Sequence, residues 1–325
     1  MHPAFSVIFL TTLLGVGQGL FLALITAQLY IAVNLVNVDE PSHFYAMGTL
    51  ISLSFLGLGL VASFFHLGHP ERALMTIRQW RTSWLSREVI ALPAFMFFVF
   101  SYGAAHYYGV DFNIIQISEN VSLNFTLVLG LIGTFLCFTL FICTGMIYAC
   151  IKFLQEWATP LTVLNFILLG GASGFSVAAV YAVIVAPNLL NLFAGWAIVL
   201  TFMAAIMRLL SLYRNAHLKP KSTTKSAIGI RHSKIRQISQ GAMGGSFNTR
   251  EYFHGKSINV VKLVKWAFLI MVFAAPLILL TIGFIQKLSI MFIVSASVQY
   301  LGLIAERWFF FAQANHPQNI YYQSA

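Results

Sequence analysis

The chain has 325 residues, of which 59% are hydrophobic and only 9% are charged, and its mean hydropathy is +0.82. Soluble domains carry roughly 25% charged residues, so this composition excludes a water-soluble globular protein. The net charge of +10 could suit a nucleic-acid-binding protein. However, the basic residues lie in connections between long apolar segments, which favours contact with membrane lipids and no nucleic acid.

Eight segments are long and apolar enough to cross a bilayer, because a hydrocarbon core of about 30 Å requires about twenty apolar residues per helix. Membrane strands would show segments of roughly ten residues with alternating polarity, and we find none. We therefore predict an all-α fold, a polytopic bundle of eight transmembrane helices in one domain, 1–325. The predicted spans are 8–33, 44–66, 88–107, 123–150, 161–186, 190–212, 260–286 and 288–307.

The distribution of charge predicts the orientation of these spans. Of the 19 Lys and Arg residues, only Lys287 falls on the second side of the membrane if all eight spans form. That second side instead carries Asp39, Glu40, Asp111 and Glu119. The positive-inside rule places the basic side in the cytoplasm, so we expect both termini to be cytoplasmic.

Small and polar residues within the spans indicate packing rather than a charged relay. The glycines of "LGVGQG", "LGLGL" and "LGGASG" suit close helix–helix contacts, although they could also leave room for a flat ligand. Gln18, Gln28 and Asn165 are the most polar residues at depth, and we expect no Asp, Glu, Lys or Arg in the span interiors. Transporters and pumps usually carry such groups there, so their absence counts against a charged pathway.

Two further observations bear on metals. His66 and His106 fall on opposite sides of the membrane and cannot share a haem. Cys137, Cys143 and Cys150 lie on one helix at a spacing unlike any metal or iron–sulfur motif. We therefore expect no haem or metal in this chain.

The stretch "FFHLGHPERALMTIRQWRTSWLSREVI", residues 64–90, is the main polar interruption of the first half of the chain. Pro70 should end the second span. Ala73, Ile77, Trp80 and Trp84 recur at helical spacing, which predicts a short interfacial helix lying on the membrane.

The same stretch contains the candidate chemistry. We expect Ser86 to cap the third span and Glu88 to fall in its first turn, where the helix dipole favours a carboxylate. His66 would lie just below the lipid headgroups. Oxidation of a quinol releases two protons, which a nearby imidazole and carboxylate can accept. An ordinary positive-inside loop is the alternative interpretation; it explains the arginines but neither His66 nor Glu88.

The longest polar stretch, 214–258, is basic and rich in Ser and Gly. It can be a flexible loop held near anionic headgroups or a docking surface for a soluble partner. Its segment "GGSFNTREYFHG" includes Phe247, Tyr252 and Phe253, which a linker would not need. Both interpretations remain open from the sequence.

The motifs "HPAFSVIFLTTLLGVGQGL", "HLGHPERA", "WRTSWLSREV" and "GGSFNTREYFHG" resemble the membrane anchor subunit of dimethyl sulfoxide reductase, within the polysulfide reductase membrane-subunit group. The resemblance covers essentially the whole chain. It implies a bacterial plasma (inner) membrane protein that holds no catalytic centre but has a quinone site of its own. It also implies two partners on the cytoplasmic face, a ferredoxin-like iron–sulfur subunit and a molybdopterin catalytic subunit.

The resemblance assigns the family's quinone-site histidine to His66, its glutamate to Glu88, and a basic position to Arg72. We expect menaquinone or ubiquinone to bind there. The predicted site and its rim comprise His66, Glu88, Arg72, Gln18, Trp80 and Arg81.

The long basic loop is more similar to the sulfite-oxidising branch of the family, so sulfite dehydrogenase and dimethyl sulfoxide reductase complexes both remain possible. Two other functions also remain open. One is a multi-pass transporter for a small anionic or neutral solute, for which the sequence lacks paired Pro-interrupted spans. The other is a purely structural anchor with no bound quinone.

Overall fold

The computed structural model describes residues 1–36, 40–118, 121–232, 234–236, 238 and 251–321. In this part of the chain eight helical segments are long and apolar enough to cross a membrane, which confirms the predicted fold class. Asp39, Glu119 and Phe247, which entered the sequence argument, lie outside the described residues.

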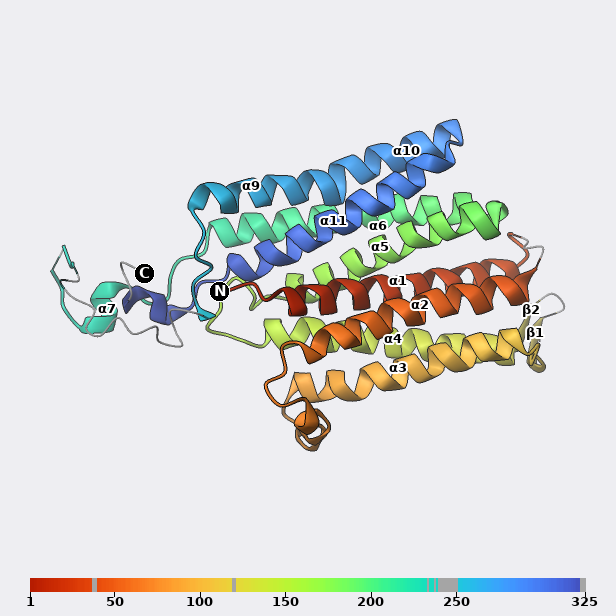
Figure 1. The fold of residues 1–325 in the computed structure, drawn as a ribbon, viewed down its shortest axis with the longest axis horizontal. Helices are drawn as coiled ribbons and strands as arrows, with labels where there is room; N and C mark the ends of the chain where they lie inside the picture. Colours follow the sequence, from red (N-terminus) through yellow and green to blue (C-terminus); the bar gives the residue numbers. More distant parts are fainter. Residues whose placement is uncertain (37–39, 119–120, 233, 237, 239–250, 322–325) are drawn as a thin grey trace.

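The spans follow one another along the chain, with long connections between the second and third spans and between the sixth and seventh (Figure 1). Each agrees with its predicted range to within a few residues. The long helices are α1 (Phe5–Ala32), α2 (Pro41–Phe64), α3 (Trp84–Tyr107), α4 (Phe125–Ala149), α5 (Pro160–Val185), α6 (Leu190–Ala216), α9 (Ile258–Leu269), α10 (Ala275–Gln286) and α11 (Ser289–Ala312). The short elements are the 3-10 helices Pro70–Gln79, Pro187–Leu189 and Pro317–Tyr321, the helix α7 (Thr224–Ile228), and the strands β1 (Asn113–Ser118) and β2 (Val121–Asn124).

The long helices form two adjoining bundles. Helices α1 to α4 pack in sequence and α4 returns to α1, while α5, α6, α9–α10 and α11 make the second bundle (Figure 1). Helix α1 is buried over most of its length, because it contacts α2 and α4 in its own bundle and α5 and α11 in the other. It is therefore the central helix of the molecule.

Glycines allow the backbones of α1 and α5 to touch. A Cβ atom on Gly19 would lie 2.1 Å from the carbonyl oxygen of Gly170, and one on Gly174 would lie 2.1 Å from the carbonyl carbon of Gly19. These distances are shorter than any real contact, so the two bundles meet where only glycine fits. The packing interpretation of "LGVGQG" and "LGGASG" is confirmed at these positions.

Helices α9 and α10 form one continuous span. They are joined by a π-helical segment, Ile270–Ala274, which ends two residues before Pro276. Proline lacks the N–H that would continue the α-helical hydrogen bonds, and a π segment lets the backbone pass such a residue without breaking.

The two ends of the molecule differ. Residues 65–83, residues 150–159, both termini and the segment that contains α7 lie at one end, which we call the basic end (Figure 1). The β1–β2 hairpin lies at the other, which we call the hairpin end. The hairpin was not predicted, since its strands of six and four residues are too short for the periodicity that membrane strands show.

The connection between α2 and α3 differs from its prediction in two ways. The expected interfacial helix is a 3-10 helix that ends at Gln79, and Trp84 is already the first residue of α3. The N-cap of α3 is Ser83, whose hydroxyl accepts a hydrogen bond from the backbone N–H of Ser86 at 3.3 Å. Glu88 therefore lies in the second turn, inside the helix rather than at its cap.

The α1–α5 contact predicts that Gly174→Ala destabilises the protein by about 1–3 kcal/mol, since an added methyl must displace backbone. Thermal unfolding in detergent would show a lowered Tm. Gly57→Ala on α2 is the matched control, because nothing lies within 4 Å of its Cβ position. Equal Tm values for the two variants would contradict the close approach.

Candidate functional site

Four of the predicted site residues lie on the surface of the basic end. His66 is two residues beyond the last residue of α2, and its side chain is exposed, as are those of Arg72, Trp80 and Arg81. The guanidinium of Arg81 lies 5.5 Å from the centre of the Trp80 ring. These side chains form an exposed basic and aromatic rim.

Arg87 fixes the turn that leads into α3. Its Nε donates a hydrogen bond to the carbonyl of Trp80, and one Nη donates to the carbonyl of Arg81, both at 2.9 Å. Its guanidinium also lies 4.1 Å from the centre of the Trp84 ring. Arg87 is therefore engaged by the turn, whereas the next residue, Glu88, points into the bundle.

Glu88 is the one predicted site residue with a charged side chain in the interior. It is 8% exposed, and its carboxylate accepts a hydrogen bond from the hydroxyl of Thr144 on α4. A carboxylate is costly to bury unless it is hydrogen-bonded or protonated. The Glu88–Thr144 pair therefore brings a proton-binding group into an apolar region.

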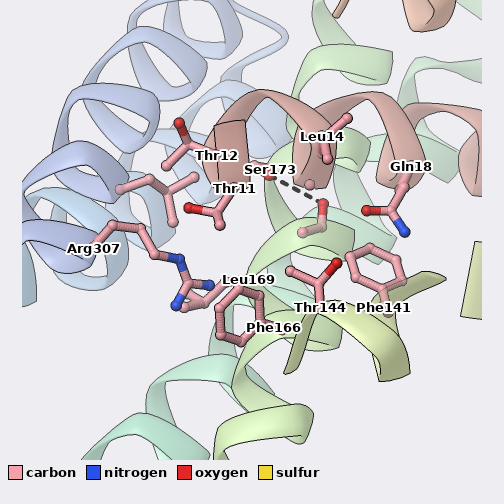
Figure 2. Close-up of a pocket in the computed structure, with 13 residues that line it drawn as sticks. Thr11, Thr12, Leu14, Gln18, Phe141, Thr144, Phe166, Leu169, Ser173 and Arg307 are labelled. Carbon is pink, nitrogen blue, oxygen red and sulfur yellow. Dashed lines mark hydrogen bonds between the residues drawn. The ribbon is translucent and has the colours of Figure 1, made fainter. Parts of the chain in front are cut away.

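Thr144 also lines an internal cavity enclosed by α1, α4, α5 and α11. Polar groups enter it from every side: the hydroxyls of Thr11, Thr12 and Ser173, the amide of Gln18, and the guanidinium of Arg307 (Figure 2). The space is about 10 Å³, enough for about one water molecule. Glu88 and Arg307 therefore approach the same small polar cavity, one through Thr144 and the other directly.

A buried cluster of charges lies behind Arg307. Glu306 forms ion pairs with Arg208 on α6, at 2.8 Å between Nε and Oε1, and with Arg307, at 3.4 Å between Nη1 and Oε2. All three side chains are 4% exposed or less. The Arg307 guanidinium also lies 3.8 Å from the centre of the Phe166 ring on α5, so the cluster joins three helices.

The expectation that the span interiors contain no charged residues was wrong. Glu88, Arg208, Glu306 and Arg307 are all buried within helices that cross the membrane. In sequence these residues lie close to the basic ends of their spans, where they look like part of the positive-inside rim. Adjacent Glu and Arg at 306–307 were the available signal, since opposite charges at depth normally pair.

Gln18 and His66 belong to different parts of the structure. Gln18 is buried, donates a hydrogen bond to the carbonyl of Cys137 at 3.0 Å and lines the polar cavity. That cavity is too small for a quinone ring. The six predicted site residues thus separate into an exposed group at the basic end and a buried group around the cavity.

An apolar groove ends at Phe65, the residue before His66. Helices α1 and α2 form it, with Ser6, Phe9 and Leu13 on one wall and Val61 and Phe65 among those on the other. Its volume is about 370 Å³, within the range of roughly 300–1,000 Å³ for small-molecule sites. The groove faces away from the polar cavity, because the two use opposite faces of α1.

The environment of His66 favours its neutral form. Partial withdrawal from water lowers the pKa of His66 below its ordinary value, and the carbonyl of Ala62 opposes the shift. A neutral imidazole at physiological pH can accept a proton. Among the described residues, no group of three or more His, Cys, Asp or Glu side chains is arranged to hold a metal ion.

These features define a helical membrane protein with a polar, proton-binding region at one end and no metal cluster in its described part. The chain belongs to the DMSO reductase anchor subunit family, whose model matches residues 1–311. It is also 51% identical over 324 residues to the C subunit of sulfite dehydrogenase from Allochromatium vinosum, a match that covers 100% of this chain and 99% of the relative.

The ion-pair cluster predicts that Glu306→Gln destabilises the protein by about 3–5 kcal/mol, because two buried guanidinium groups would lose their carboxylate. Thermal unfolding should show a large decrease in Tm. Glu71→Gln is the control, since this exposed carboxylate is at the same end. A Tm for Glu306→Gln as close to wild type as that of Glu71→Gln would show that the cluster does not stabilise the bundle.

Proposed function

We propose that this chain anchors a molybdoenzyme complex in the bacterial plasma membrane and passes electrons between membrane quinone and an iron–sulfur subunit. The observation that carries the proposal is the full-length match to a subunit of sulfite dehydrogenase. A sulfite dehydrogenase-type complex is the form we favour, because that relative covers the chain end to end. The basic loop 214–258 supports the same choice.

The partner subunits would dock on the basic end, which we assign to the cytoplasm. Support comes from the exposed rim, where Arg72 lies on the 3-10 helix and Trp80 and Arg81 lie on the turn that Arg87 holds in place. Arginine and tryptophan are the side chains most enriched at protein interfaces. An iron–sulfur subunit seated there would lie directly above His66.

The groove between α1 and α2 is the proposed quinone site. A bound quinone would supply two-electron, two-proton redox chemistry at the membrane surface. His66 follows Phe65 of the groove wall in sequence, just beyond the end of α2, and its neutral imidazole would receive a proton from a ring hydroxyl. The apolar groove would hold the ring and tail and exclude water.

Glu88 is proposed to hold and release a proton at the edge of the interior cavity. Its support is chemical: a buried carboxylate, a hydroxyl bridge through Thr144, and a cavity with room for one water. Arg307, on the far side of the cavity, would balance the negative charge of the ionised form. His66 and Glu88 then have separate roles, the first at the ring and the second in the interior of the bundle.

We expect His66→Ala to reduce quinone-linked turnover of the assembled complex by at least about a hundredfold, the lower end of what a general acid or base contributes. Turnover with a soluble electron acceptor should stay unchanged. His69→Ala is the control, since this histidine is exposed in the same connection. Full quinone-linked activity in His66→Ala would contradict the assignment.

The lowered pKa of His66 gives a prediction for pH. If the neutral imidazole accepts the proton during quinol oxidation, the rate should fall as pH decreases through that pKa, so the acid limb should lie below about 6.5. A pH–rate profile of quinol oxidation measures the limb. His66→Gln should remove it, and an acid limb unchanged in that variant would assign it to another group.

A further inference from the structure

A second polar pocket lies at the hairpin end of the first bundle. It is formed where α1 and α3 end and α2 and α4 begin, and its volume is about 190 Å³. Along α3, its residue His106 is about 27 Å from Glu88, at 1.5 Å per residue. The pocket is therefore separate from the region proposed above for quinone.

Two buried polar groups face this pocket. Tyr45 of α2 is 2% exposed and His106 of α3 is 8% exposed, and both line the pocket. Among the described residues, neither the Tyr45 hydroxyl nor Nε2 of His106 has a hydrogen-bond partner. Buried polar groups are normally satisfied, so these two lack a partner that their burial calls for.

The surrounding residues hold the two groups in fixed positions. The rings of Tyr45 and His106 lie 4.6 Å apart between centres at 32°, and the Tyr102 ring meets His106 edge-on, also at 4.6 Å. The Tyr102 hydroxyl donates to Gln28 at 2.9 Å, and Gln28 donates to Thr126 at 2.8 Å. Tyr102, Gln28 and Thr126 are therefore hydrogen-bonded to one another. The Tyr45 hydroxyl and Nε2 of His106 take no part in this chain of hydrogen bonds.

The chemistry of the lining selects a class of ligand. The carboxylate of Asp111 lines the pocket, which disfavours an anion, and the described residues offer no trio of ligands for a metal ion. Aromatic walls and two isolated hydrogen-bonding groups suit a neutral planar ring that carries oxygen atoms. The helix ends that form the pocket lie at the depth of the bilayer interface, where amphipathic rings concentrate.

We propose that this pocket binds the headgroup of a quinone or hydroquinone, with Tyr45 and His106 as hydrogen-bond partners of its ring oxygens. The ligand class rests on the proposed function, since a quinone-linked anchor lies in a membrane that contains such molecules. The pocket is a binding site at the opposite end of α3, distinct from the groove between α1 and α2.

Photolabelling of the purified full-length chain in lipid nanodiscs would test the proposal. The probe is an azido-substituted naphthoquinone without an isoprenoid tail, and labelled residues are located by peptide mass spectrometry. We expect labels within residues 41–48 and 102–111. Tyr45→Phe and His106→Gln should each reduce this labelling by about fivefold at subsaturating probe, the loss expected for one neutral hydrogen bond.

Tyr107→Phe is the matched control, because this hydroxyl is adjacent to His106 in sequence but its side chain is 75% exposed; its labelling should equal that of wild type. A second control, His66→Ala, should change labelling only at the basic end. Labels at the hairpin end alone would support this pocket and contradict the proposed function. No labels at the hairpin end, or labels insensitive to both Tyr45→Phe and His106→Gln, would overturn the proposal.

Discussion

The ion pairs of Glu306 with Arg208 and Arg307 constrain the rest of the structure. Charged side chains removed from water cost several kcal/mol each unless they are paired, so α6 and α11 must align for the Glu306–Arg208 pair to form. Because Glu306 and Arg307 are consecutive on α11, they leave the helix in different directions. Glu306 faces Arg208, while Arg307 reaches past Phe166 into the cavity between the two bundles.

That arrangement explains why Glu88 can be buried. The cluster holds two arginines and one glutamate, and so carries one excess positive charge. Glu88 approaches the same cavity from α4's side through Thr144. An ionised Glu88 would thus complete the charge balance of the interior, and a protonated one would leave an excess positive charge there.

The middle of the first bundle is closed by aromatic packing. The ring of Phe21 meets those of Phe95 and Tyr102 edge-on, at 5.4 and 5.6 Å between centres. All three side chains are fully buried. A packed middle separates the polar groups of the basic end from those of the hairpin end, an arrangement that suits an anchor with sites near each surface better than a solute transporter.

Much of the fold could be predicted from sequence, because eight apolar segments leave few alternatives in a bilayer. Close helix contacts at the glycines of α1 and α5 were also predicted, because glycines within membrane spans favour close helix packing. The buried charges could not be predicted, since a charged residue near a span end has the same appearance whether it faces lipid headgroups or a partner inside the bundle. Glu88 was chosen as a candidate from its place in the sequence, but its partner Thr144 lies 56 residues away and appears only in three dimensions.

The measurement that tests the account most directly is affinity purification of this chain in a mild detergent, with identification of bound proteins and analysis of molybdenum and iron. The account predicts that an iron–sulfur protein and a molybdopterin protein purify together with the chain, and that both metals are present. A chain that emerges alone and without metal, under conditions that keep other membrane complexes intact, would contradict the anchor function.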